Sequence, residues 1–125
     1  MRYALVVTGP VYGNQKSTSA WMFAKALLEA KHTIESIFFH QEAVSNASAF
    51  ISPASDEHDL AAEWVRLSVE ENIPLNICVS AALRRGIIDR EQNSQEMYNL
   101  HPQFNLTGLG SLATSLLTCD RVVQF

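Results

Sequence analysis

One cysteine stands where a thiol is often made reactive. Cys78 lies near the end of an apolar run, residues 75–79, that is typical of a buried strand, and the small residues after it favour a helix. A thiol at the start of a helix faces backbone N–H groups that have no partner within the helix. These groups stabilise an anion, and the thiolate is the nucleophilic form of cysteine. We expect Cys78 to be either a reactive sulfur carrier or a small core residue.

The second cysteine and two nearby arginines bear on whether Cys78 is reactive. Cys119 precedes an apolar run at the end of the sequence, and we expect it to be a core residue. The two cysteines form no C-x-x-C motif, and a structural disulfide between them is not expected in a reducing compartment. Arg84 and Arg85 lie about a helical turn downstream of Cys78, so either could add positive charge if it folds back, or could instead face solvent or a partner.

A second loop resembles a nucleotide-binding motif only superficially. Residues 9–17 contain glycines and Lys16, but Gln15 rather than glycine precedes the lysine, and the glycine spacing differs from that of a phosphate-binding loop. The four histidines lack the spacing of metal ligands. His40 ends an expected strand near the same edge, so it is a weak candidate for a supporting role.

Length and composition indicate one globular domain over residues 1–125. The chain is 47% hydrophobic and 18% charged, as in a folded soluble protein. Its net charge of −4 argues against binding a polyanion directly. The first apolar run is too short for a signal peptide and no run could cross a membrane, so we expect a cytoplasmic protein.

Strand and helix patterns alternate along the sequence. Apolar residues recur at helical spacing after the first turn, and Asp56 has the chemistry of a helix N-cap. We predict strands over residues 3–8, 33–39, 75–79 and 122–125, and helices over about 17–31, 56–71 and 109–117. The small polar residues 41–55 predict a long, mobile excursion that gates access to Cys78. Residues 86–89 fit a turn or a short extended piece, and 90–102 stay unassigned.

This alternation predicts a doubly wound α/β fold, with a mostly parallel five-stranded sheet and helices on both faces. Sites in such sheets lie beyond the carboxyl ends of the strands. Cys78 and the loop at residues 9–13 both follow predicted strands, so we expect both at that edge.

Segments spread along the whole sequence resemble DsrE-like sulfurtransferases. The matching residues are 6–10, 12–13, 52–57, 75–79, 81–86, 106–112 and 118–125. The resemblance implies that Cys78 is the catalytic cysteine, which carries sulfur as a persulfide. It implies no metal and no organic cofactor.

The same resemblance implies a set of partners. It places the chain in a cytoplasmic heterohexamer with TusB-like and TusC-like subunits, which takes sulfur from a TusA-like donor and passes it to a TusE-like acceptor. The sulfur ends as the 2-thio group of a tRNA wobble uridine. Neither direct contact with nucleic acid nor contact with a membrane is implied.

Three other functions stay open from the residues. A DsrE-type subunit of a sulfur-oxidation complex would use the same thiol chemistry in another pathway. A non-catalytic scaffold subunit would not need Cys78 at all. A flavodoxin-like module would bind a nucleotide or another anion at residues 9–13.

Overall fold

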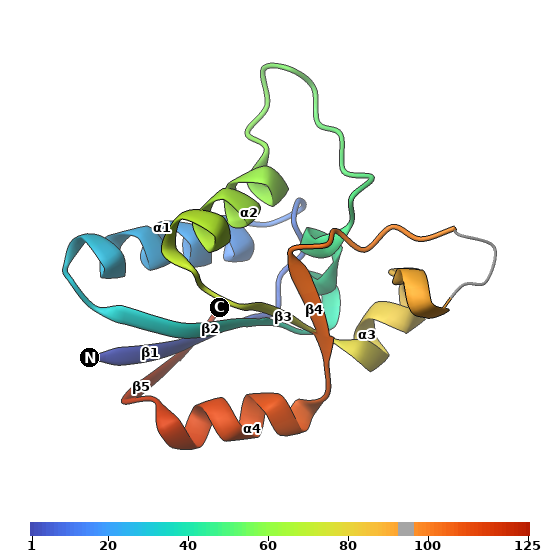
Figure 1. Ribbon diagram of the computed structural model, residues 1–125. Helices are drawn as coiled ribbons and strands as arrows, with labels where there is room; N and C mark the ends of the chain where they lie inside the picture. Colours follow the sequence, from blue (N-terminus) through green and yellow to red (C-terminus); the bar gives the residue numbers. More distant parts are fainter. Residues whose placement is uncertain (93–96) are drawn as a thin grey trace.

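The structure, a computed structural model, describes residues 1–92 and 97–125 and contains one parallel sheet (Figure 1). The strand order is β4-β3-β2-β1-β5, and every neighbouring pair is parallel. The strands are β1 Arg2–Val7, β2 Thr33–Phe39, β3 Leu75–Cys78, β4 Phe104–Thr107 and β5 Arg121–Gln124. The predicted α/β fold is therefore confirmed.

Helices cover the sheet unequally on its two faces. The helices are α1 Lys16–Glu29, α2 Leu60–Glu71, α3 Val79–Arg84 and α4 Leu109–Thr118, with 3-10 helices η1 Gln41–Ala47 and η2 Arg90–Gln92. In Figure 1, α1 and α2 lie on one face of the sheet, α4 lies on the other, and α3 lies beyond the end of β3. In the part of the chain that the structure describes, no helix has the length and apolar content that crossing a membrane requires.

The main core lies between the sheet and the α1–α2 layer. Trp64 of α2 is fully buried and packs edge-to-face on Phe39 of β2, with ring centroids 5.1 Å apart. The buried residues of α1 recur at helical spacing, as predicted for the helix over 17–31. Both ends of α1 lie within two residues of the predicted ones, which is the ordinary uncertainty of helix ends.

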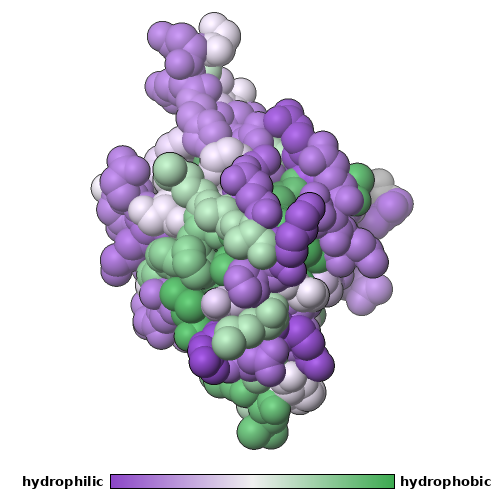
Figure 2. Space-filling model, turned by 90° about the vertical axis from the view of Figure 1, so that its left-hand side faces the viewer, coloured by the Kyte–Doolittle hydropathy of each residue, from purple (hydrophilic) through white to green (hydrophobic). Residues whose placement is uncertain are grey.

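Helix α4, on the other face of the sheet, is packed less closely than α1 and α2. The predicted helix near 109–117 is confirmed, but none of its residues is buried, and Leu117 is 87% exposed. Figure 2 shows apolar surface in the lower part of the molecule, at the level of α4. Cys119, just after α4, is only partly buried and lies outside the core. The prediction that Cys119 is a core residue is therefore wrong.

The prediction of an unstructured excursion is wrong for its first half. Residues Gln41–Ala47 form η1, and four of these seven residues are buried. At its centre, the Asn46 side chain donates hydrogen bonds to Ser17 Oγ and the Ala43 carbonyl and accepts one from Trp64 Nε1. This network joins η1 to α1 and α2. It holds in place a segment that its small polar residues alone would indicate as a mobile loop.

Two further boundaries differ from the prediction. The second long helix begins at Leu60, because Asp59 rather than Asp56 is the N-cap: its Oδ1 accepts a hydrogen bond from the Ala62 N–H at 3.2 Å. Strand β4 falls just after the unassigned segment 90–102, of which residues 93–96 lie outside the described residues. Gly86 has φ of 75°, so a turn rather than a strand follows α3.

Candidate functional site at the carboxyl end of the sheet

Cys78 occupies the junction that its sequence context predicts. It is the last residue of β3 and the N-cap of α3, with extended backbone angles of φ −65° and ψ 118°. Its side chain is buried, with 4% of the residue exposed, and it belongs to the core cluster. Cys78 and Cys119 are both free thiols.

The connections that follow β3 and β4 leave the sheet on opposite faces. Cys78 pairs in register with Thr107, the last residue of β4. After β3 the chain returns on the α2 face, where His101 and residues of α2 line a common cavity. After β4 it enters α4 on the opposite face (Figure 1). Parallel strands whose following connections diverge in this way leave a crevice at their carboxyl ends, where α/β proteins bind ligands.

The strand register also shows on which face of the sheet the Cys78 side chain lies. The hydroxyl of Ser36 in β2 lies 3.2 Å from that of Ser115 in α4, so Ser36 faces α4. Alternation along β2 places Phe38 on this face as well. Phe38 pairs in register with Asn76, and Cys78 follows Asn76 by two residues. Cys78 therefore lies on the α4 face of the sheet, at the carboxyl edge.

Two polar side chains flank Cys78 on the neighbouring chain segments. On β4, Thr107 pairs in register with Cys78. On the other side, Phe39 of β2 pairs with Ile77, so the next residue, His40, lies level with Cys78. The Thr107 Oγ1 and His40 Nδ1 atoms are buried, and neither has a hydrogen-bond partner among the described residues. Since nearly all buried polar atoms in folded proteins are bonded, such atoms require an explanation.

Arg85 supplies positive charge near the thiol, because it folds back over α3. Its Nη1 donates to the Ala81 carbonyl at 3.1 Å, while Nη2 and Nε donate to Glu42 Oε1 at 2.7 and 3.2 Å. These bonds to Glu42 raise the pKa of Arg85, and negative charge on Cys78 would act in the same direction. Arg85 in turn lowers the pKa of Glu42. The Arg85 guanidinium is thus within electrostatic reach of the sulfur, although Arg84 and Arg85 are both exposed residues.

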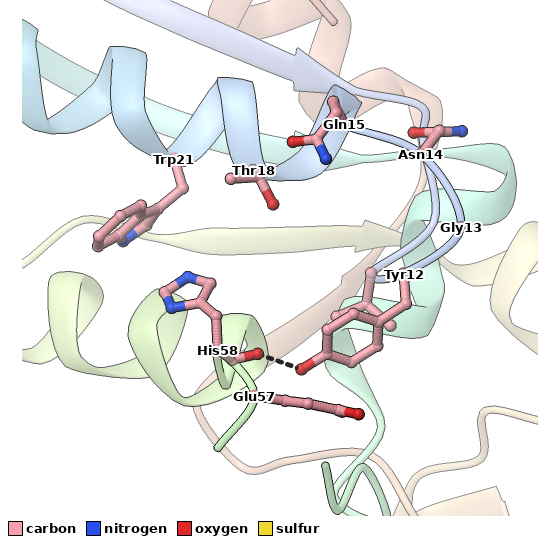
Figure 3. Close-up of a pocket in the computed structure, with 9 residues that line it drawn as sticks. Tyr12, Gly13, Asn14, Gln15, Thr18, Trp21, Glu57 and His58 are labelled. Carbon is pink, nitrogen blue, oxygen red and sulfur yellow. Dashed lines mark hydrogen bonds between the residues drawn. The ribbon is translucent and has the colours of Figure 1, made fainter. Parts of the chain in front are cut away.

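A separate cavity of about 790 Å³ opens beside the loop after β1 (Figure 3). The Tyr12 hydroxyl donates to the His58 carbonyl at 2.7 Å, and the Trp21 ring lies 5.4 Å from the His58 ring. The residues that line it include neither lysine nor arginine, while Glu57 adds negative charge. This charge weighs against an anion site at residues 9–13. Cys78 does not line this cavity.

Among the described residues, the other titratable groups do not gather into a metal site. Across residues 1–92 and 97–125, no three His, Cys, Asp or Glu side chains gather as metal ligands would. His101 accepts a hydrogen bond from the Gln103 N–H at its Nδ1, and burial lowers its pKa. Sulfur chemistry at Cys78 is therefore the reaction that this edge of the sheet supports best.

The sequence predicts Cys78 as the catalytic residue and His40 as a weak supporting candidate, but it does not point to Thr107 or Glu42, which the structure places near Cys78 and Arg85. Glu42 lies in the segment predicted to be mobile. Thr107 ends a strand of four residues, and the alternating run Phe104–Thr107 before Gly108 is the signal that indicates it.

Comparisons with known proteins agree with this fold. A family model described as the DsrE/DsrF-like family matches residues 1–125. The chain is 52% identical to Sulfurtransferase TusD of Proteus mirabilis, over 100% of this chain and 98% of that one. It is 54% identical to Sulfurtransferase TusD of Salmonella paratyphi B, over 100% of both chains.

A solved structure shares the fold at low sequence identity. The crystal structure of the ychN protein from E. coli matches with a TM-score of 0.82 and 21% identity, over 99% of this chain and 98% of that chain. Because the family model and the curated relatives extend over the whole sequence, the chain belongs to the DsrE/DsrF-like family.

Proposed function

We propose that this protein is a sulfurtransferase that carries sulfur as a persulfide on Cys78. The full-length relatives, at 52% and 54% identity, bear out the sulfurtransferase activity expected from the sequence. The observation that carries the assignment to Cys78 is its position. It ends β3 where the following connections diverge, and within electrostatic reach of Arg85. Two buried polar atoms flank it, and neither has a hydrogen-bond partner among the described residues.

Sulfur transfer at Cys78 requires no net oxidation. The Cys78 thiolate attacks the outer sulfur of a donor persulfide, R–S–SH. A new S–S bond forms, the S–S bond of the donor breaks, and the products are Cys78–S–SH and the donor thiolate R–S⁻. An acceptor thiolate then takes the outer sulfur in the same way and releases the Cys78 thiolate. Both steps are thiol–disulfide exchanges, whose rates depend on the thiolate fraction of the attacking group and on the pKa of the leaving thiol.

Access to the sulfur requires local movement, since Cys78 is 4% exposed. Of the elements beside it, η1 is held by the buried Asn46 network. Helix α3 has only six residues and is joined to η1 through the exposed Arg85–Glu42 pair. We therefore propose that a docking partner displaces α3 rather than η1. The gating role predicted for residues 41–55 stays a prediction.

We further propose that the chain works in a cytoplasmic heterohexamer with TusB-like and TusC-like subunits. A TusA-like protein would supply the sulfur, a TusE-like protein would accept it, and the product would be a 2-thiolated wobble uridine in tRNA. The family membership supports these partners. The exposed apolar residues of α4 support a subunit interface, because large apolar patches at the surface often mark interaction sites.

The pathway is tested in cells that lack the native protein but keep its partners. We expect wild-type protein and Cys119→Ser to restore 2-thiouridine at the tRNA wobble position, whereas Cys78→Ser does not. Full restoration by Cys78→Ser would favour the scaffold function. Normal tRNA thiolation in cells without any copy of the protein would favour a sulfur-oxidation pathway.

A further inference from the structure

We infer that Thr107 and His40 bind the outer sulfur of the persulfide on Cys78. In this inference, Thr107 Oγ1 and His40 Nδ1 donate hydrogen bonds to the carried sulfur atom. The inference rests on the proposed function, because it assigns the residues that hold the transferred atom. The two residues would contact the reacting sulfur directly, and neither belongs to a sequence motif around Cys78.

The first support is position. Neighbouring strands in a sheet lie about 4.8 Å apart, and register partners project to the same face. Thr107 and His40 therefore lie on either side of Cys78, at the same level of the sheet. His40 keeps the extended backbone of β2, and its N–H donates to the Val7 carbonyl at 2.9 Å, so the sheet geometry continues to this residue.

The second support is the length of a persulfide. Neither Thr107 Oγ1 nor His40 Nδ1 is hydrogen-bonded to the Cys78 sulfur, or to any other atom of the described residues. A sulfur–sulfur bond places the second sulfur about 2 Å beyond the first. The loaded cysteine therefore extends further from β3 than the free thiol does, on the face that the two flanking residues share.

The third support is the contrast with the other buried polar groups. In the described part of the chain, the buried polar residues Ser17, Ser36, Asn46 and Ser68 all have hydrogen-bond partners. A buried polar atom without a hydrogen-bond partner lowers the stability of the fold. Its presence therefore indicates that it binds something other than the folded chain. Besides the two beside Cys78, the described residues contain one more such atom, Trp21 Nε1. Trp21 lies against His58 at the separate cavity (Figure 3).

The two donors fit the chemistry of the transfer. A persulfide that loses its proton carries negative charge on its outer sulfur, and this charge repels an incoming acceptor thiolate. Hydrogen bonds from a hydroxyl and from a ring N–H stabilise this anion and offset its charge. They also fix the direction of the outer sulfur, so that the acceptor can approach in line with the S–S bond.

The test measures the equilibrium of persulfide exchange between the full-length protein and glutathione persulfide, with the loaded fraction read by intact mass. Each variant carries Cys119→Ser, so that only Cys78 is loaded. Thr107→Val removes the hydroxyl at nearly constant shape, and Thr107→Ser keeps it. His40→Phe removes the ring N–H, and His40→Asn keeps a donor near the Nδ1 position. Thr114→Val is the matched control, because the Thr114 hydroxyl donates to the Gly110 carbonyl within α4, away from Cys78.

We expect the exchange constant to fall about tenfold in Thr107→Val and in His40→Phe, the loss typical of a hydrogen bond to a charged group. The Thr107→Ser, His40→Asn and Thr114→Val variants should keep the wild-type constant. Thermal stability should be unchanged or higher in Thr107→Val, because the variant removes a buried hydroxyl that bonds to none of the described residues. Weaker loading in a protein that is no less stable is the signature of a binding role.

Two results would overturn the inference. One is an unchanged exchange constant in both Thr107→Val and His40→Phe. The other is a loss of loading that follows a loss of thermal stability and that Thr107→Ser does not rescue. Failure of the proposed function is a different result: Cys78→Ser alone, which keeps Cys119, would then take up sulfur as the wild-type protein does.

Discussion

The Arg85 guanidinium donates two hydrogen bonds to a single carboxylate oxygen of Glu42. This pair joins the end of α3 to the first turn of η1, so it connects the two elements that adjoin Cys78. The Glu42 side chain is 62% exposed and the Arg85 side chain is 30% exposed. Exposed ion pairs contribute little to stability, so a docking partner can break this one at small cost.

We predict that Glu42→Gln makes Cys78 more accessible. Without the pair, α3 separates from η1 more often, and the rate of Cys78 alkylation by iodoacetamide should rise about two- to fivefold. The measurement follows alkylation by mass in the Cys119→Ser background. Glu63→Gln is a matched control, since it breaks an ion pair with Arg66 on α2. Equal alkylation rates in Glu42→Gln and in the parent protein would show that the pair does not restrain α3.

Asn46 should be important for folding rather than for sulfur transfer. Its amide bonds to Ser17, Ala43 and Trp64, and Asn46→Ala leaves buried polar groups without partners. We expect the free energy of unfolding in urea to fall by about 2–4 kcal/mol. Asn105→Ala, at an exposed position, should change it little. A loss of stability in Asn46→Ala no larger than in Asn105→Ala would refute the structural role.

His101 should make stability sensitive to acid. Burial lowers its pKa in the folded state below the ordinary value of 6.5. Near that pH the unfolded chain binds a proton that the folded protein does not, so the free energy of unfolding falls as the pH drops through it. His101→Asn keeps an acceptor for the Gln103 N–H and removes the titration. Unfolding in urea between about pH 7 and pH 5 should then show a weaker pH dependence, and an unchanged dependence would contradict this assignment.

The exposed apolar residues of α4 should matter for assembly and not for folding. Leu117 is 87% exposed, so Leu117→Gln should change the free energy of unfolding by no more than about 0.5 kcal/mol. We expect the same variant to weaken co-purification with TusB-like and TusC-like subunits. Thr114→Gln, at an exposed polar position on α4, is the control. Normal co-purification of Leu117→Gln would place the interface elsewhere.

The sequence predicts most of the fold because strands that are buried on both faces are continuous apolar runs. It indicates β4 only weakly, because the alternating run Phe104–Thr107 has only four residues. It does not reveal η1, because the burial of that segment depends on Asn46 bonding to residues far along the chain. Local patterns contain no information about such distant partners.

The same distinction between local and distant information applies to the candidate site. Cys78 is predictable, because a strand end followed by a helix start is a local pattern. Thr107 is not, because its place beside Cys78 depends on the register of β3 and β4. The fold of Arg85 back onto Glu42 likewise requires η1 to be in place.

The location of the carried sulfur is the most direct measurement. The full-length protein is incubated with a persulfide donor, and the added sulfur is mapped to a peptide by mass spectrometry. A persulfide carrier at Cys78 predicts one added sulfur atom on the Cys78 peptide, unchanged loading in Cys119→Ser and none in Cys78→Ser. Undiminished loading of Cys78→Ser, or sulfur found only on Cys119, would contradict it.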